Sequence, residues 1–143
     1  MPSIRPLTPA DLEAVVALAD QLGYPNTPAA VAERIAAVLP HPDHAAFVAE
    51  RAGAVVGWAH VHATLFLQGS EGAELAGMVV ADGERGSGVG RALLAAAEEW
   101  ARERGLPVMR VRSRSTREGA HGFYRDAGYA EVKTSLTFEK PLG

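Results

Sequence analysis

The sequence predicts one α+β domain over residues 1–143, in which helices flank a central, mixed and mostly antiparallel sheet. Two observations lead to this prediction. First, the apolar positions change repeatedly between the helical repeat and the alternation of a strand, in the order strand, two helices, three strands, helix, strand, helix, strand. Second, 143 residues with 48% hydrophobic and 22% charged residues are the length and composition of one ordinary globular domain.

The first elements are a short strand and two helices. Both helices open with threonine followed by proline, at Thr8-Pro9 and Thr27-Pro28. The threonine can cap the helix, and proline suits the first helical position. Gly23 ends the first helix and Pro40 stops the second.

Three strands are predicted next, at residues 45–51, 54–66 and 74–80. Ala52-Gly53 forms the turn between the first two strands, and "QGSEGA" at 68–73 is typical of a loop before the third.

The second half begins with an amphipathic helix that runs through Arg104 and ends at Gly105. A strand at 107–113 and a short helix at 119–128 follow. The last prediction is a strand at 130–140, because apolar and polar residues alternate there. Its shared face would carry Val132, Thr134, Leu136 and Phe138.

A glycine-rich turn, "RGSGVG" at 85–90, stands between a strand and a helix. Glycine lets the backbone approach a ligand closely, and the open N–H groups at a helix start bind anions. The turn therefore indicates a phosphate site. A Walker loop is excluded because Arg91 follows Gly90 where lysine is required. A dinucleotide fingerprint is weak, because Arg91 replaces its last glycine and "ADGE" separates the turn from the strand.

A third pattern fits better. Arg85, Gly88 and Gly90 follow a strand that ends at Val80, which resembles the acyl-CoA loop of the GNAT acetyltransferases. A second motif of that family is matched by four residues, Ala120, Tyr124, Gly128 and Tyr129. The resemblance covers almost the whole chain, including the order of its elements.

The resemblance implies an N-acetyltransferase that transfers an acetyl group directly from acetyl-CoA to a primary amine, with no metal. The pyrophosphate would be held by backbone N–H groups of the turn, and the pantetheine arm by the strand before it. The implied cofactor-binding residues are Met78, Val79, Val80, Arg85, Gly86, Ser87, Gly88, Val89, Gly90 and Arg91. A backbone N–H near Val80 would face the acetyl carbonyl.

Two side chains are candidates for proton transfer. Tyr124 occupies the family's tyrosine position and would protonate the leaving thiolate, since a phenol is protonated at neutral pH. Its alternative role is packing beside Phe123. Glu74 is the candidate base, because strand alternation predicts one face for Glu74, Ala76, Met78 and Val80. Glu74 could equally lie at a solvated strand end; Glu71, a histidine or water are the other candidates.

Other polar residues have plainer interpretations. His60 and His62 share a strand face, where hydrogen bonding or solvation is the expected role and a base or an acceptor-pocket lining the alternative. Arg110, Arg112 and Arg114 share a face of the next strand, which favours a solvated or ion-paired face over nucleic-acid binding. Arg117 stands where many members of the family have asparagine.

The composition narrows the function further. The net charge of −3 does not favour a nucleic-acid partner, and the absence of cysteine excludes an acylated cysteine. We expect a cytoplasmic protein, because no signal peptide and no membrane span is recognisable.

The acceptor is expected to be a small-molecule amine. A protein amine, a non-catalytic acyl-CoA sensor and a nucleic-acid module are the alternatives. A homodimer is compatible with the resemblance.

Overall fold

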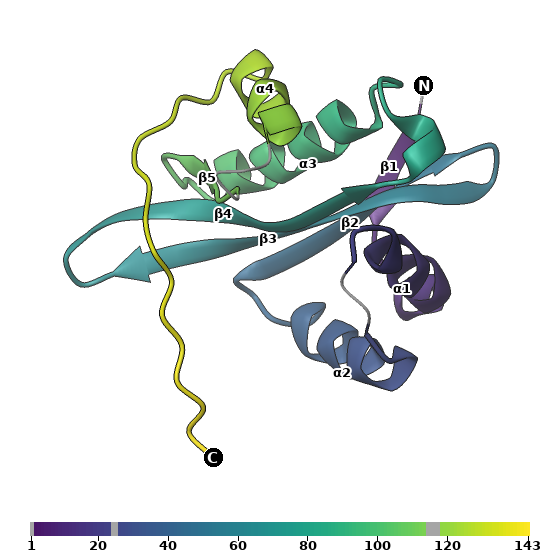
Figure 1. Ribbon diagram of the computed structural model, residues 1–143, viewed down its shortest axis with the longest axis horizontal. Helices are drawn as coiled ribbons and strands as arrows, with labels where there is room; N and C mark the ends of the chain where they lie inside the picture. Colours follow the sequence, from purple (N-terminus) through teal and green to yellow (C-terminus); the bar gives the residue numbers. More distant parts are fainter. Residues whose placement is uncertain (1, 24–25, 114–117) are drawn as a thin grey trace. The chain divides into compact units, whose positions relative to one another are not determined.

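The structure is a computed structural model that describes residues 2–23, 26–113 and 118–143 (Figure 1). It consists of two units, Met1–Val111 and Arg112–Gly143. The first unit holds β1 (Ser3–Pro6), α1 (Leu12–Gln21), α2 (Pro28–Val38), β2 (His44–Arg51), β3 (Ala54–Phe66), β4 (Gly69–Val80), α3 (Val89–Glu103) and β5 (Met109–Val111). Single 3-10 turns, Pro9–Asp11 and Asp82–Glu84, precede α1 and α3, and the second unit holds α4 (Glu118–Asp126).

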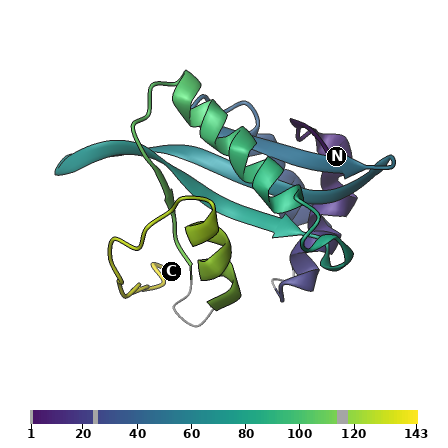
Figure 2. The ribbon, with the colours of Figure 1, turned by 90° about the horizontal axis from the view of Figure 1, so that it is seen from above.

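The five strands form one mixed sheet in the order β1-β2-β3-β4-β5. Neighbours are antiparallel from β1 to β4, and only β4 and β5 run parallel. Helices α1 and α2 lie on one face of the sheet and α3 on the other (Figure 1). Viewed from the α3 side, that helix crosses the strands at a slant (Figure 2). The predicted α+β class, with a mixed and mostly antiparallel sheet flanked by helices, is confirmed.

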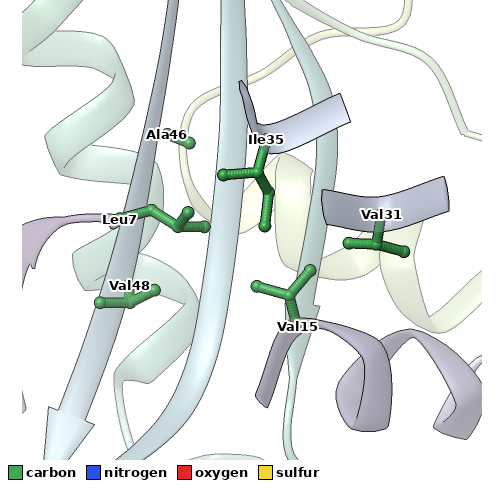
Figure 3. Packing of buried hydrophobic residues seen from close by; sticks show 6 residues of the cluster. All are labelled: Leu7, Val15, Val31, Ile35, Ala46 and Val48. Atoms are coloured by element: carbon green, nitrogen blue, oxygen red, sulfur yellow. The ribbon is translucent and has the colours of Figure 1, made fainter. Parts of the chain in front are cut away.

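The core has a layer on each face of the sheet. Under α1 and α2, one cluster contains six buried side chains, which point toward one another (Figure 3): Leu7, Val15, Val31, Ile35, Ala46 and Val48. Under α3, Val89, Leu93 and Ala97 are fully buried. Each large aliphatic side chain buried in this way contributes roughly 1.5–3 kcal/mol, so both helix layers are held by apolar contact.

The first helix is anchored to the sheet by a buried carboxylate. Asp11 accepts hydrogen bonds from Arg5 on β1, with Nη1 at 2.9 Å from Oδ2 and Nη2 at 2.8 Å from Oδ1. The N–H of Thr8 donates to the same carboxylate at 2.8 Å and completes a capping box. The hydrogen bonds from Arg5 hold the pKa of Asp11 below its ordinary value of 3.8. The predicted threonine caps are therefore present at Thr8 and, through a bond from the N–H of Ala30, at Thr27.

Two sequence-based predictions of local structure are wrong. Residues 69–73, predicted as part of a loop, belong to β4, because the β3–β4 hairpin extends to a pairing of Phe66 with Gly69. Residues 130–140 form no strand. Alternation describes only the side chains, whereas a strand also needs a neighbouring backbone to bond with. Within its own unit this segment leaves three large apolar side chains exposed, namely Val132, Leu136 and Phe138.

Candidate functional site

The glycine-rich turn forms the entry to α3. Gly86 and Gly88 have φ values of 79° and 90°, in the left-handed region that favours glycine. Gly88 is the N-cap residue, and the helix starts at Val89. A Cβ built on Gly86 or Gly88 would meet no atom within 4 Å. These two glycines are therefore required by backbone conformation, and the space beside them is open.

The first turn of α3 directs its N–H groups out of the helix end. The first hydrogen bond of the helix runs from the N–H of Ala92 to the carbonyl of Gly88 at 3.0 Å. By helix geometry the N–H groups of Val89, Gly90 and Arg91 point out of the helix end, where the positive end of the helix dipole lies. Arg85 adds an exposed guanidinium, 67% accessible and 3.6 Å from the carboxylate of Asp82. Such a helix end is suited to an anion.

Side-chain contacts from the β2–β3 hairpin hold the glycine-rich turn in place. Arg51 at the end of β2 forms an ion pair with Glu84, with Nε at 2.6 Å from Oε1, and also donates to the carbonyl of Ser87 at 3.4 Å. On the other side, Asp82 donates its N–H to the side chain of Gln21 at the end of α1, at 3.2 Å. Sequence reasoning missed this bracing, because its partners are distant in the chain.

Strand β4, which leads into the turn, contains a β-bulge at Ala76. His60 on β3 lies opposite Gly77, whereas the next residue, Val61, lies opposite Leu75. Ala76 is thus the extra residue of β4 at this point. Because side chains alternate along a strand, the bulge reverses the face of every side chain that follows it.

The bulge corrects one prediction about Glu74. We predicted one face for four side chains: Glu74, Ala76, Met78 and Val80. Glu74 instead pairs with His62, on the sheet face that Trp58 shares with the α1–α2 cluster. Val80 pairs with Gly57, whose added Cβ would meet Leu93 of α3 at 3.0 Å. Glu74 and Val80 therefore face opposite sides of the sheet.

The outer edge of β4 is open beyond the bulge. Strand β5 pairs with β4 only from Ala73 to Leu75. In the described part of the sheet no strand lies beside Met78–Val80 on that side. Ala81 donates its N–H to β3, at 2.8 Å from the carbonyl of Val56. Since successive N–H groups alternate between the two edges, the N–H of Val80 points to the open edge.

A histidine cluster lies on the α1–α2 face around Glu74. His44 on β2 is hydrogen-bonded to His60, with Nδ1 at 2.8 Å from Nε2, and its ring stacks on His62 at a centroid distance of 5.2 Å. His62 Nε2 is 3.5 Å from Glu74 Oε2. His41 contacts the ring of His44 edge-on at 4.7 Å. Burial lowers the pKa of His60 to about 4 and also lowers that of His44.

The hydrogen-bonded role predicted for His60 is thus confirmed, whereas His41 and His44 were missed. The β2–β3 register brings His44 opposite His62, and His41, which precedes β2, joins the cluster through its ring contact with His44. Among the described residues, no group of three or more histidine or acidic side chains is arranged to hold a metal ion.

Tyr124 lies in the second unit, on α4. This helix ends in a Schellman motif, in which Gly128 has φ 97° and donates to Arg125 at 3.0 Å, and Tyr129 donates to the carbonyl of Tyr124 at 2.9 Å. The rings of Tyr124 and Tyr129 lie 5.9 Å apart, edge to face, and Phe123 contacts Tyr124 at 5.2 Å. The second sequence motif therefore contains the closing turn of a helix, and Tyr124 has a packing role whatever its hydroxyl does.

The arginine-rich strand is shorter than predicted. Strand β5 spans Met109–Val111, so it includes Arg110 but not Arg112. Arg110 lies opposite Glu74 in the β4–β5 register. Arg114 and Arg117 lie outside the described residues. No helix in the described part of the chain has the length and apolarity needed to cross a membrane.

Known proteins identify the fold and the family. Residues 12–129 match the Acetyltransferase (GNAT) family. The aminoglycoside N(6')-acetyltransferase type 1 of Stenotrophomonas maltophilia is 35% identical over 146 residues, which cover 99% of this chain and 94% of that protein.

Two solved structures are similar over nearly their full lengths. One, named as a transcriptional regulator from Bacillus halodurans C-125, has a TM-score of 0.88 and 27% identity, and the match covers 98% of this chain and 100% of that one. The other, the aminoglycoside N-acetyltransferase AAC(6')-Iy in complex with CoA, has a TM-score of 0.88 and 22% identity, with 98% and 95% coverage. The chain belongs to the GNAT acetyltransferase family and is an acetyl-CoA-dependent N-acetyltransferase.

Proposed function

We propose that this enzyme acetylates a primary amine of an aminoglycoside-type small molecule, with acetyl-CoA bound at the start of α3. The observation that carries the proposal is the left-handed turn at Gly86 and Gly88, which opens the helix N-terminus to an anion. The acceptor class is supported by the 35% identical aminoglycoside acetyltransferase, whose match covers 99% of this chain. A net charge of −3 also suits a polycationic acceptor.

The turn fits the diphosphate of CoA in three respects. The N–H groups of Gly86 and of Gly88 to Arg91 would bind it, and a Cβ built at Gly86 or Gly88 would meet no atom within 4 Å, so the backbone can be approached closely there. The helix dipole and the guanidinium of Arg85 both favour negative charge there. Val89 would contribute through its backbone, because its side chain is buried. Ser87 would contribute only by holding the turn in shape, because its N–H, at 3.2 Å, and its hydroxyl both donate to the carbonyl of Glu84.

The open edge of β4 fits the pantetheine arm. The arm contains two amide groups, which can pair with an unpaired strand edge as an added strand would. We assign this role to the backbone of Met78, Val79 and Val80. The outward N–H of Val80 is the group we expect to bind the acetyl carbonyl, where it would stabilise the negative charge that develops during transfer.

Two side chains are proposed to move protons. Tyr124 would donate its phenolic proton to the leaving thiolate, a role for which a group protonated at neutral pH is suited. Glu74 would accept the proton of the amine, directly or through water. Its support is its half-buried place on the strand that would hold the acetyl group. Glu71 is the weaker candidate, since its side chain is exposed in the hairpin.

The assay is thiol release from acetyl-CoA in the presence of single amines: an aminoglycoside, a polyamine and a peptide with a free N-terminus. The proposal expects turnover with the aminoglycoside. Turnover with the peptide alone would replace it by protein N-acetylation. Saturable CoA binding in calorimetry without thiol release for any amine would favour an acyl-CoA sensor.

The two units are proposed to act as one acetyltransferase domain, since the family match at residues 12–129 includes parts of both. We also propose a homodimer. It is supported by the segment 130–142, which within its own unit leaves Leu136 and Phe138 exposed to 81% and 87%. Large apolar side chains gathered in one exposed segment favour burial against a partner. Light scattering after size exclusion should give twice the chain mass, and Leu136→Ser with Phe138→Ser should give the monomer mass. A monomer before substitution would contradict the dimer.

A further inference from the structure

We propose that His62 is a positioning residue that shares one proton with Glu74, so that the pair, and not the carboxylate alone, accepts the proton released by the amine. This inference rests on the proposed function, in which Glu74 is the base. It assigns a role to the histidine cluster, which the acetyl-CoA site does not use.

The hydrogen bonds of His62 determine which ring nitrogen faces Glu74. Nδ1 lies 3.1 Å from the carbonyl oxygen of Ala63, which can only accept, so Nδ1 carries a proton. In the neutral ring Nε2 then has a lone pair. This nitrogen lies 3.5 Å from Glu74 Oε2.

An unprotonated nitrogen and a carboxylate oxygen repel each other at this distance, because both are acceptors. A single proton between them removes the repulsion, whether it resides on Nε2 or on the carboxyl group. The pair therefore has a net charge of −1 before it takes a proton and 0 afterwards. In the reaction, the proton leaves the amine nitrogen as the C–N bond forms, binds Glu74 and is shared with His62; the C–S bond breaks and the thiolate takes the proton of Tyr124.

The groups around His62 favour this single proton. They are His60 on the same strand, His44 on β2, His41 and Asp43 before β2, Glu74 on β4, and Arg110 opposite Glu74 on β5. His44 and His60 bond to each other, and burial keeps the pKa values of both low, so both are neutral at pH 7. A second positive charge beside His62 is thereby avoided, and the stacked ring of His44 limits rotation of His62.

The kinetic test compares His62→Gln with His41→Gln. Glutamine can still donate to Ala63 but cannot take up a proton. We expect His62→Gln to lower kcat about 10- to 100-fold, to leave KM for acetyl-CoA within about twofold, and to change the acidic limb of the pH–rate profile. His41→Gln removes an exposed histidine of the same cluster and should behave as the parent enzyme.

A double variant separates a shared role from two independent roles. If His62 acts through Glu74, then Glu74→Gln with His62→Gln should be no slower than Glu74→Gln by more than about threefold. If the double variant instead lowers kcat by the product of the two single-variant factors, the proposal is overturned. A parent-like pH profile in His62→Gln would also overturn it.

A measurement without turnover keeps this inference separate from the proposed function. The nitrogen-15 chemical shift of His62 Nε2 reports on the shared proton. The spectra are recorded just below the pH of the acidic limb, where the pair holds its proton. There Glu74→Gln should move this shift toward that of an unprotonated ring nitrogen, whereas His41→Gln should leave it in place. If the Nε2 chemical shift is the same in Glu74→Gln as in the parent, the inference is overturned even in an active enzyme. If no amine is acetylated, the proposed function fails and the ring measurement still decides on the shared proton.

Discussion

The backbone of the turn before α3 can be tested by replacing one glycine and a matched neighbour with alanine. Gly88 and Gly83 lie five positions apart in the same exposed stretch, and a Cβ at either would meet no atom within 4 Å. Only Gly88 has a positive φ, of 90°. Any difference between Gly88→Ala and Gly83→Ala therefore measures backbone strain and not steric contact.

The expected strain is about 1–2 kcal/mol, the cost of holding an L-residue in the left-handed region. For a chain of this length, 1 kcal/mol lowers Tm by roughly 3–4 °C, so Gly88→Ala should lose about 3–8 °C. Gly83→Ala should stay within about 2 °C of the parent, as surface substitutions without strain do.

The same strain can instead lower the affinity for CoA. If the turn in Gly88→Ala relaxes to escape the strain, CoA must restore the left-handed conformation on binding. The Kd for CoA would then rise about 5- to 30-fold, the equivalent of 1–2 kcal/mol, while Tm changes less. Thermal unfolding followed by circular dichroism measures the change in Tm, and calorimetric titration with CoA measures the change in Kd. If Gly88→Ala equals Gly83→Ala in both Tm and Kd, the turn is not a conformationally required part of the site.

Three further predictions address the anchor of α1, the buried histidine and the second motif. The pKa of Asp11 is lowered by Arg5, so the ionised carboxylate stabilises the fold above pH 3.8, its unfolded-state pKa, and this stabilisation is lost as pH falls further. Asp11→Asn should therefore lower the free energy of unfolding by about 1–3 kcal/mol at pH 7. Urea unfolding should also show that this variant loses less stability below about pH 4 than the parent does. The pKa of His60 is lowered from 6.5 to about 4, so the unfolded chain takes up this proton first and the fold loses stability as pH falls between these values; His60→Gln should flatten the dependence of Tm on pH in that window, and an unchanged slope would contradict neutral burial. Tyr124→Phe keeps the ring contact with Tyr129 but removes the phenol, so it should lower kcat about 10- to 100-fold with Kd for CoA unchanged, and full turnover would remove Tyr124 from the chemistry.

Much of the fold was predictable because its signals are local. Threonine–proline pairs mark the 3-10 turn that leads into α1 and the start of α2, and the glycine-rich turn marks the start of α3. Strand β3 has the predicted bounds, Ala54–Phe66, because its apolar run is bordered by turns. The left-handed conformation of the turn was predictable for the same reason, because such conformations favour glycine and the sequence has glycine at both positions.

The features that sequence reasoning missed depend on pairing between distant residues. The bulge at Ala76 has no residue type of its own, so the faces of Glu74 and Val80 were unpredictable without the β3–β4 register. The contact of His44 with His62 likewise exists only through the antiparallel pairing of β2 and β3. Alternation over residues 130–140 predicted a strand, but alternation cannot supply a partner backbone.

The central claim is that the open amides at the start of α3 bind the diphosphate of CoA. Amide nitrogen-15 spectra of the labelled protein test it most directly, in parallel titrations with CoA and with pantetheine, which lacks the diphosphate. The claim predicts large, saturable shifts for the amides of Gly86 and of Gly88 to Arg91 with CoA and none at these positions with pantetheine. Shifts confined to other parts of the chain, or equal responses to both compounds, would contradict it.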